Sequence, residues 1–72
     1  MNADKHTAAA RTLRRLAGET DVSLHLAAER DDPLATMRHL EERNLLLDLA
    51  IWHEEQAAAK RLAAVEVAPA IS

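Results

Sequence analysis

Three of the four histidines in this 72-residue sequence, His25, His39 and His53, recur at intervals of 14 residues with acidic residues close by. Imidazole nitrogen and carboxylate oxygen are suitable ligands for Zn²⁺ and similar divalent ions. On one helix, 14 residues separate His39 from His53 by about 21 Å, so these two cannot share an ion. A helical hairpin that turns at residues 31–32 would instead bring His25 level with His39.

Both of these histidines fall on the polar side of their predicted helices, where a solvated imidazole is the usual outcome. The acidic pairs Glu41-Glu42 and Glu54-Glu55 do not form a di-iron motif, because no histidine stands three residues after a glutamate. Ion pairs with nearby basic side chains explain these acids better. We predict no metal, no cofactor and no catalytic residue, with a metal-binding bundle as a second alternative.

The segment LAAERDDPLATMRHLEERNLL, which begins at Leu26, resembles the helix-turn-helix of bacterial winged-helix regulators. Their recognition helix often has an Ala-Thr pair followed by Arg-His-Leu and a Leu-Glu-Glu-Arg run. The resemblance implies a DNA-binding or transcription-associated module as an alternative function. It also implies that Thr36, Arg38, His39 and Arg43 face the groove, with Arg38 as the base reader.

The distribution of charge disfavours nucleic acid as a partner. Residues 21–66 hold ten acidic and five basic residues, whereas residues 1–20 hold two acidic and four basic ones. Most of the chain would therefore repel a polyanion. The sequence also lacks a long apolar run and the apolar core of a signal peptide, so we expect a cytoplasmic protein that does not bind membranes.

Helices must position all of these residues, because Ala, Leu, Arg and Glu dominate and only nine residues are β-branched. Asp32 and Pro33 mark the clearest helix start, since aspartate caps free N–H groups and proline suits the first helical position. This helix meets no breaker before Pro69. We predict a helix over about 33–66 and a frayed tail at 67–72.

The first helix is predicted over about 4–30. Its small and apolar residues keep one phase at about 100° per residue, and that phase does not change at Gly18. Gly18 weakens the helix by about 1 kcal/mol relative to alanine and is the place where a kink would form. The line consists of His6, Ala9, Ala10, Leu13, Leu16, Ala17, Thr20, Leu24, Ala27 and Ala28.

The second helix carries two apolar stripes about 100° apart. The long stripe consists of Met37, Leu40, Asn44, Leu47, Ile51, Ala58, Leu62 and Val65, and the other of Leu34, Leu45, Leu49, Trp52, Ala59 and Ala63. An antiparallel first helix can cover only one stripe, so we expect the other to face a second copy. The predicted fold is an all-α antiparallel two-helix hairpin that assembles into a four-helix bundle.

Composition also indicates an oligomer, because 16 of the 35 apolar residues are alanine and no cysteine is present to form a disulfide. We therefore predict one unit over residues 1–72 that forms a homodimer or tetramer. Asn44 is expected to fix the register and Trp52 to anchor the contact. The predicted interface consists of Met37, Leu40, Asn44, Leu47, Ile51, Trp52 and Leu62. The predicted function is a non-enzymatic interaction module of the adaptor, chaperone or regulator type, which binds itself and a protein partner.

Overall fold

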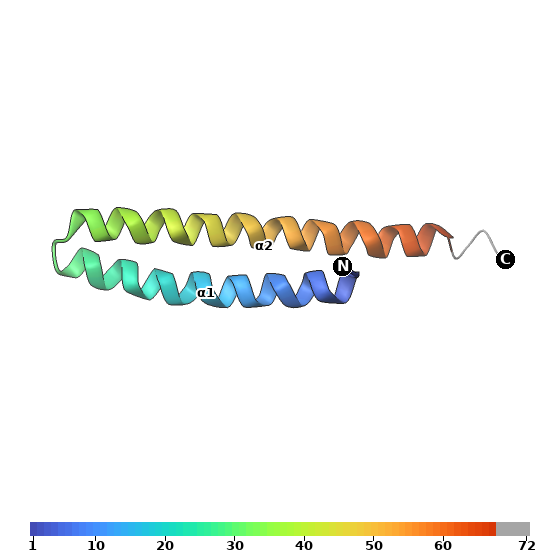
Figure 1. Cartoon of the computed structure of the whole chain (residues 1–72), viewed down its shortest axis with the longest axis horizontal. Helices are drawn as coiled ribbons and strands as arrows, with labels where there is room; N and C mark the ends of the chain where they lie inside the picture. The colour runs from blue at the N-terminus through green and yellow to red at the C-terminus, as the bar shows by residue number, and fades with distance from the viewer. Residues whose placement is uncertain (68–72) are drawn as a thin grey trace.

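The computed structural model describes residues 1–67, which form two antiparallel helices, α1 (Ala3–Glu29) and α2 (Pro33–Val67). Figure 1 shows the two helices side by side, with the N-terminus beside the last third of α2. The predicted all-α hairpin is confirmed, and both helix ranges agree to within one residue. Val67 still belongs to α2, and the remaining residues of the predicted tail lie outside the described part of the chain.

The turn between the helices is a Schellman motif, a standard way to end an α-helix. The N–H of Asp31 donates to the carbonyl oxygen of Ala28 at 3.1 Å, and the N–H of Asp32 donates to that of Ala27 at 3.0 Å. Asp31 takes the left-handed conformation that this motif requires, with φ at 54°. Asp32 then caps α2 as predicted, because its Oδ1 accepts a hydrogen bond of 3.1 Å from the N–H of Ala35.

At the other end of the hairpin, Asn2 caps α1 by accepting a hydrogen bond of 2.8 Å from the N–H of Lys5. From there α1 continues without interruption through Gly18, as the unbroken phase of its small residues predicted. The backbone of Gly18 does not have a positive φ, and no side chain lies within 4 Å of the place where its Cβ would be. Gly18 is therefore an ordinary helical residue on the outside of α1.

The helices meet along a narrow seam of small side chains. The buried apolar residues of the described chain are Ala10, Ala17, Ala27, Ala50 and Ala57, with His6 and Thr20 as the buried polar residues. Their spacing of three, four and seven residues is the heptad pattern of two helices that coil around each other. None of the large side chains described is fully buried. The two backbones thus approach closely, yet the hairpin has very little apolar core.

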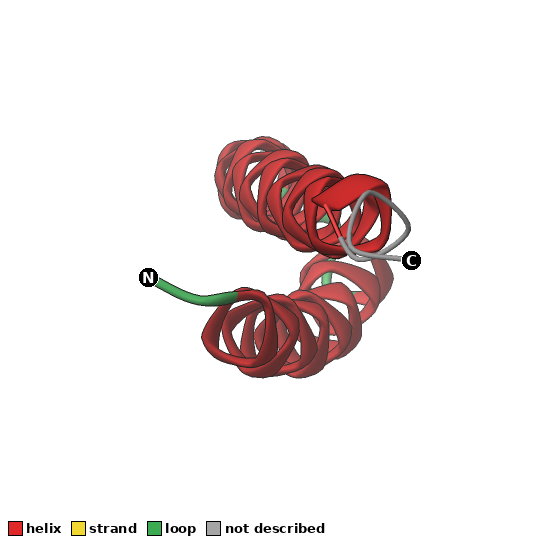
Figure 2. Ribbon diagram, turned by 90° about the vertical axis from the view of Figure 1, so that its right-hand side faces the viewer, coloured by secondary structure: helices red, strands yellow, loops and turns green. Residues whose placement is uncertain are grey.

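The molecule is a thin rod. Its principal extents are 63 × 15 × 14 Å and its radius of gyration is 17.4 Å, whereas a compact chain of this length would have a radius near 11 Å, roughly. The view along the rod in Figure 2 shows the two helices as a single pair. Each helix therefore has one neighbour and leaves most of its circumference open to solvent. Over the described residues, neither helix is long and apolar enough to cross a membrane.

Candidate functional site

The α1 helix covers neither of the two apolar stripes of α2. On α2 the seam follows Ala50 and Ala57, which belong to neither stripe. Leu40 and Leu47 of the long stripe are half-buried at the edge of the seam, and the other stripe is exposed at all its described positions. The expectation that α1 would cover one stripe is therefore wrong. The physical reason is that alanine permits the closest approach of two backbones, and ion pairs beside the seam hold α2 in this rotation.

These ion pairs follow one side of the seam, which we call the ion-paired flank. The guanidinium of Arg14 donates two hydrogen bonds of 2.7 Å to the carboxylate of Glu54. Further along the rod, Arg43 donates to Oδ1 of Asp21 at 2.7 Å. Near the open end of the hairpin, Arg61 donates to the hydroxyl of Thr7 at 2.9 Å. Every one of these bonds joins α1 to α2, so together they set the register of the helices.

Electrostatics at the first of these pairs favours both charged forms. The hydrogen bonds from Arg14 lower the pKa of the Glu54 carboxyl, and the same bonds raise the pKa of Arg14. Both side chains remain close to half exposed. Water and dissolved ions therefore screen the pair, and its main effect is to position the helices.

The opposite side of the seam carries large exposed apolar side chains on both helices. We call it the apolar flank and define it by Leu16 and Leu26 of α1 and Leu45, Leu49 and Trp52 of α2, whose exposed fractions run from 37% to 61%. A shallow hollow on this side is lined by residues of both helices, including Ser23, Leu26, Ala35 and His39. Leu16 lies one heptad before Ser23, and Leu49 lies two heptads after Ala35. The heptad spacing thus places the leucines on the same side as the hollow.

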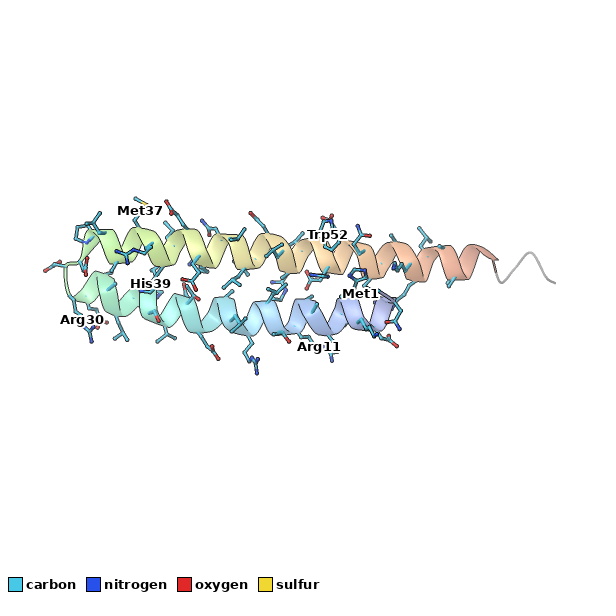
Figure 3. The ribbon with its side chains drawn as sticks, viewed as in Figure 1. Met1, Arg11, Arg30, Met37, His39 and Trp52 are labelled. Atoms are coloured by element: carbon cyan, nitrogen blue, oxygen red, sulfur yellow. The ribbon has the colours of Figure 1, made fainter. Side chains whose placement is uncertain are left out.

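A second apolar surface belongs to α2 alone. We call it the outer stripe and define it by Met37, Ile51, Leu62 and Val65, which are between 44% and 62% exposed. Figure 3 shows Met37 on the side of α2 that faces away from α1. This surface lies beyond the ion-paired flank and is one helix wide.

The residues predicted from the sequence to form the interface are divided between these surfaces. Met37, Ile51 and Leu62 lie on the outer stripe, Asn44 is exposed beside them, and Leu40 and Leu47 border the seam on the same side. Trp52 lies on the apolar flank and is 49% exposed, so the single chain does not bury it as a core residue would be buried. The hairpin thus leaves both predicted stripes available for contact.

A histidine pair lies across the seam near the open end of the hairpin, and the sequence analysis did not identify it. Nδ1 of His6 lies 2.8 Å from Nδ1 of His53, and the ring of Trp52 meets the ring of His6 edge-on with centroids 5.7 Å apart. A hydrogen bond between two imidazoles requires one protonated and one unprotonated nitrogen, so both rings are neutral or only one is charged. Burial lowers the pKa of His6, and the positive charges of Lys60, His53 and the N-terminal amine lower it further.

The structure does not bring His25 and His39, the two histidines considered as metal ligands, together in a metal site. His25 is exposed, and its ring makes a hydrogen bond of 2.7 Å with the carbonyl oxygen of Asp21 on its own helix. His39 is half-buried and lies between the helices (Figure 3), contrary to the expectation that it is solvated. Within the described residues, no three side chains of His, Cys, Asp or Glu are grouped as metal ligands.

The residues implied by the helix-turn-helix resemblance do not share one exposed face. Arg43 is half-buried and bound to Asp21, His39 is half-buried, and Thr36 donates its hydroxyl to the carbonyl oxygen of Asp32 at 2.7 Å. Arg38 alone of the four is fully exposed. The segment from Leu26 onward forms the end of α1, the tight turn and the start of a long α2 that lies antiparallel to α1, so α2 is not free along its length to enter a groove.

A hollow of about 500 Å³ lies beside the turn, where Ala28, Thr36, Met37 and Leu40 line it. Its walls are mainly apolar, it opens to solvent, and the titratable residues in its lining are Asp31 and Asp32 of the turn. Comparison of this chain with protein-family models, with curated proteins and with solved structures finds no match.

Proposed function

We propose that this chain is a non-enzymatic helical interaction module that works as a homo-oligomer, in which two hairpins form a four-helix bundle. One observation carries this proposal: the only buried apolar residues among those described are alanines. Over residues 1–65, every leucine, isoleucine, valine, methionine and tryptophan keeps part of its surface in water. The hairpin is therefore a folded half of a bundle rather than a complete one.

The energetic argument follows from the burial. A large apolar side chain contributes about 1.5–3 kcal/mol when it is fully removed from water, and a hairpin whose leucines are at most half-buried gains only part of this. Neither a disulfide nor a cluster of metal ligands in the described residues compensates for the loss. Contact with another helical surface would supply the missing burial, and a second copy of the same chain is always available to provide it.

Two surfaces imply two kinds of contact. The apolar flank involves both helices and suits a second hairpin, whereas the outer stripe is one helix wide and suits a helix of a protein partner. In this proposal the interface residues Met37, Leu40, Asn44, Leu47, Ile51 and Leu62 serve the partner, and Trp52 serves the second copy. The hollow beside the turn is wide open to solvent, whereas small-substrate sites enclose most of their ligand, and this favours a binding role.

Sedimentation equilibrium together with thermal unfolding followed by circular dichroism tests the proposal. We expect a helical dimer or tetramer at micromolar concentration and a Tm that rises with protein concentration, because folding and association are coupled. A folded species of 7.9 kDa whose Tm is independent of concentration would contradict the proposal. For the outer stripe, a partner captured by the parent protein should be lost with Met37→Asp, while the oligomer remains intact.

A further inference from the structure

We infer that the second copy packs on the apolar flank, over Leu16 and Leu26 of α1 and Leu45, Leu49 and Trp52 of α2, and that the ion-paired flank faces outward. This inference rests on the proposed function and adds to it the surface that a second copy uses. It differs from the expectation based on sequence, in which the long stripe of α2 supplied most of the contact.

The first argument is that only this flank carries exposed leucines of both helices. Each helix of a four-helix bundle contacts two neighbours, so the side of the hairpin that faces the second hairpin must carry apolar residues on α1 as well as on α2. The ion pairs Arg14–Glu54 and Asp21–Arg43 fix the register and place Leu16 near the heights of Leu49 and Trp52. Leu16, Leu49 and Trp52 therefore lie at similar heights near the middle of the rod, and Leu26 lies nearer the turn.

The second argument comes from charge. On the ion-paired flank, the groove between the helices is covered by Arg14, Glu54, Asp21 and Arg43. A second hairpin packed there would remove these charges from water, and the pairs already formed recover only part of the lost hydration. Among the described residues, no ion pair joins α1 to α2 on the apolar flank. A second copy can therefore pack there without removing an interhelical ion pair from water.

The third argument is the amount of surface. The chain exposes 5373 Å², which exceeds by roughly 1,000 Å² the area typical of a compact monomer of 7.9 kDa. A stable dimer of ordinary size buries about 800 Å² on each partner. The excess surface of the hairpin is therefore sufficient for a dimer contact, and the apolar flank is the part of it that both helices share.

Aspartate substitutions at matched positions distinguish the surfaces. Leu49 on the apolar flank is 43% exposed and Ile51 on the outer stripe is 44% exposed, and two residues of separation place them on nearly opposite sides of α2. We expect Leu49→Asp and Leu16→Asp to raise the Kd of the dimer by about 100-fold or more, and Ile51→Asp to change it by less than about 3-fold. The measurement is sedimentation equilibrium at several loading concentrations.

A second measurement does not depend on variants that disrupt the assembly. Because the chain has no cysteine, Leu49→Cys and Ile51→Cys each introduce a single thiol. Burial in an interface protects a thiol from a soluble alkylating reagent. We expect the thiol at position 49 to react about tenfold more slowly when the protein is concentrated enough to assemble, and the thiol at position 51 to react at an unchanged rate.

The outcomes separate the two proposals. If the parent chain assembles but Ile51→Asp dissociates it and Leu49→Asp does not, or if the thiol at position 51 is the protected one, the assignment of the apolar flank is wrong. Equal loss of assembly in all three aspartate variants, or equal protection of both thiols, also contradicts it. A parent chain that stays monomeric and folded contradicts the proposed function itself.

Discussion

The guanidinium of Arg14 on α1 and the carboxylate of Glu54 on α2 are joined by two hydrogen bonds of 2.7 Å across 40 residues of sequence. We expect Glu54→Gln, which keeps the shape and removes the charge, to lower the Tm in dilute buffer. The difference from the parent should shrink in about 1 M NaCl, because salt screens exposed pairs. Glu55→Gln is the matched control, since Glu55 is exposed and forms no ion pair within the described residues.

The histidine pair predicts a loss of stability in mild acid. His6 has a lowered pKa in the folded chain because it is buried and faces His53, Lys60 and the N-terminal amine. The unfolded chain therefore takes up a proton first, so the free energy of unfolding falls as the pH drops below about 6.5, the ordinary pKa of histidine. Thermal unfolding between about pH 7.5 and pH 5.5 should show this decline.

Variants at histidine positions identify the source of the decline. His6→Leu should remove most of the pH dependence in this range, because it removes the buried group that titrates. His25→Gln should retain it, since His25 lies in solvent on the outside of α1. A His6→Leu protein that loses stability in mild acid as steeply as the parent would show that another group is responsible.

The two aspartates of the turn predict opposite effects of substitution. Asp31 has a φ of 54°, which glycine adopts without strain, so Asp31→Gly should stabilise the hairpin by about 1 kcal/mol. Asp32 accepts the N–H of Ala35, so Asp32→Ala should destabilise it by about 1 kcal/mol through loss of the helix cap. Denaturant titration of both variants measures the free energy of unfolding, and effects of the same sign would contradict the turn geometry.

Replacement of the single glycine tests the continuity of α1. Gly18→Ala should stabilise the protein by about 0.5–1 kcal/mol, because alanine is the better helix former. The structure gives the added methyl group free space, with nothing within 4 Å of its position. A fall in the midpoint of urea unfolding would instead indicate that this position needs a conformation that only glycine adopts.

DNA binding is the discriminating test for the helix-turn-helix alternative. We expect no complex with duplex DNA tighter than about 10 µM at physiological salt, which is weaker than specific binders reach. Arg43 is held by Asp21, and the acidic residues of α2 oppose a phosphate backbone. A mobility-shift titration that shows a submicromolar, salt-sensitive complex lost with Arg38→Ala would favour the DNA-binding alternative over the interaction module.

The sequence was sufficient to predict the elements and the turn. Asp32 and Pro33 carry local information about where a helix begins, and this information does not depend on the rest of the fold. The unbroken phase of small residues across Gly18 likewise predicted one long α1. Periodicity also identified all five buried residues of α1, and with them the side of α1 that forms the seam. The left-handed role of Asp31 was missed because glycine or asparagine is the usual signal for it.

The rotation of α2 could not be predicted in the same way. Hydrophobic periodicity selects the most apolar face of a helix, and on α2 that face differs from the one that packs on α1. The seam on α2 alternates alanine with polar residues such as His39, Arg43 and His53, and this pattern gives almost no hydrophobic signal. The His6–His53 pair could have been predicted from the sequence, because a turn at residues 31–32 places His6 within about one helical turn of the level of His53.

The alanines of the seam also affect how the longitudinal offset of α1 and α2 is determined. Successive alanines have nearly identical side chains, so their contacts alone hardly favour one longitudinal offset of the helices over another. The apolar seam therefore determines the distance between the helices but contributes little to their longitudinal offset. The ion pairs Arg14–Glu54 and Asp21–Arg43 therefore determine the longitudinal offset of the two helices. The short turn at Asp31 and Asp32 still limits this offset when both ion pairs are lost, so such chains should stay helical and shift along each other only by small amounts.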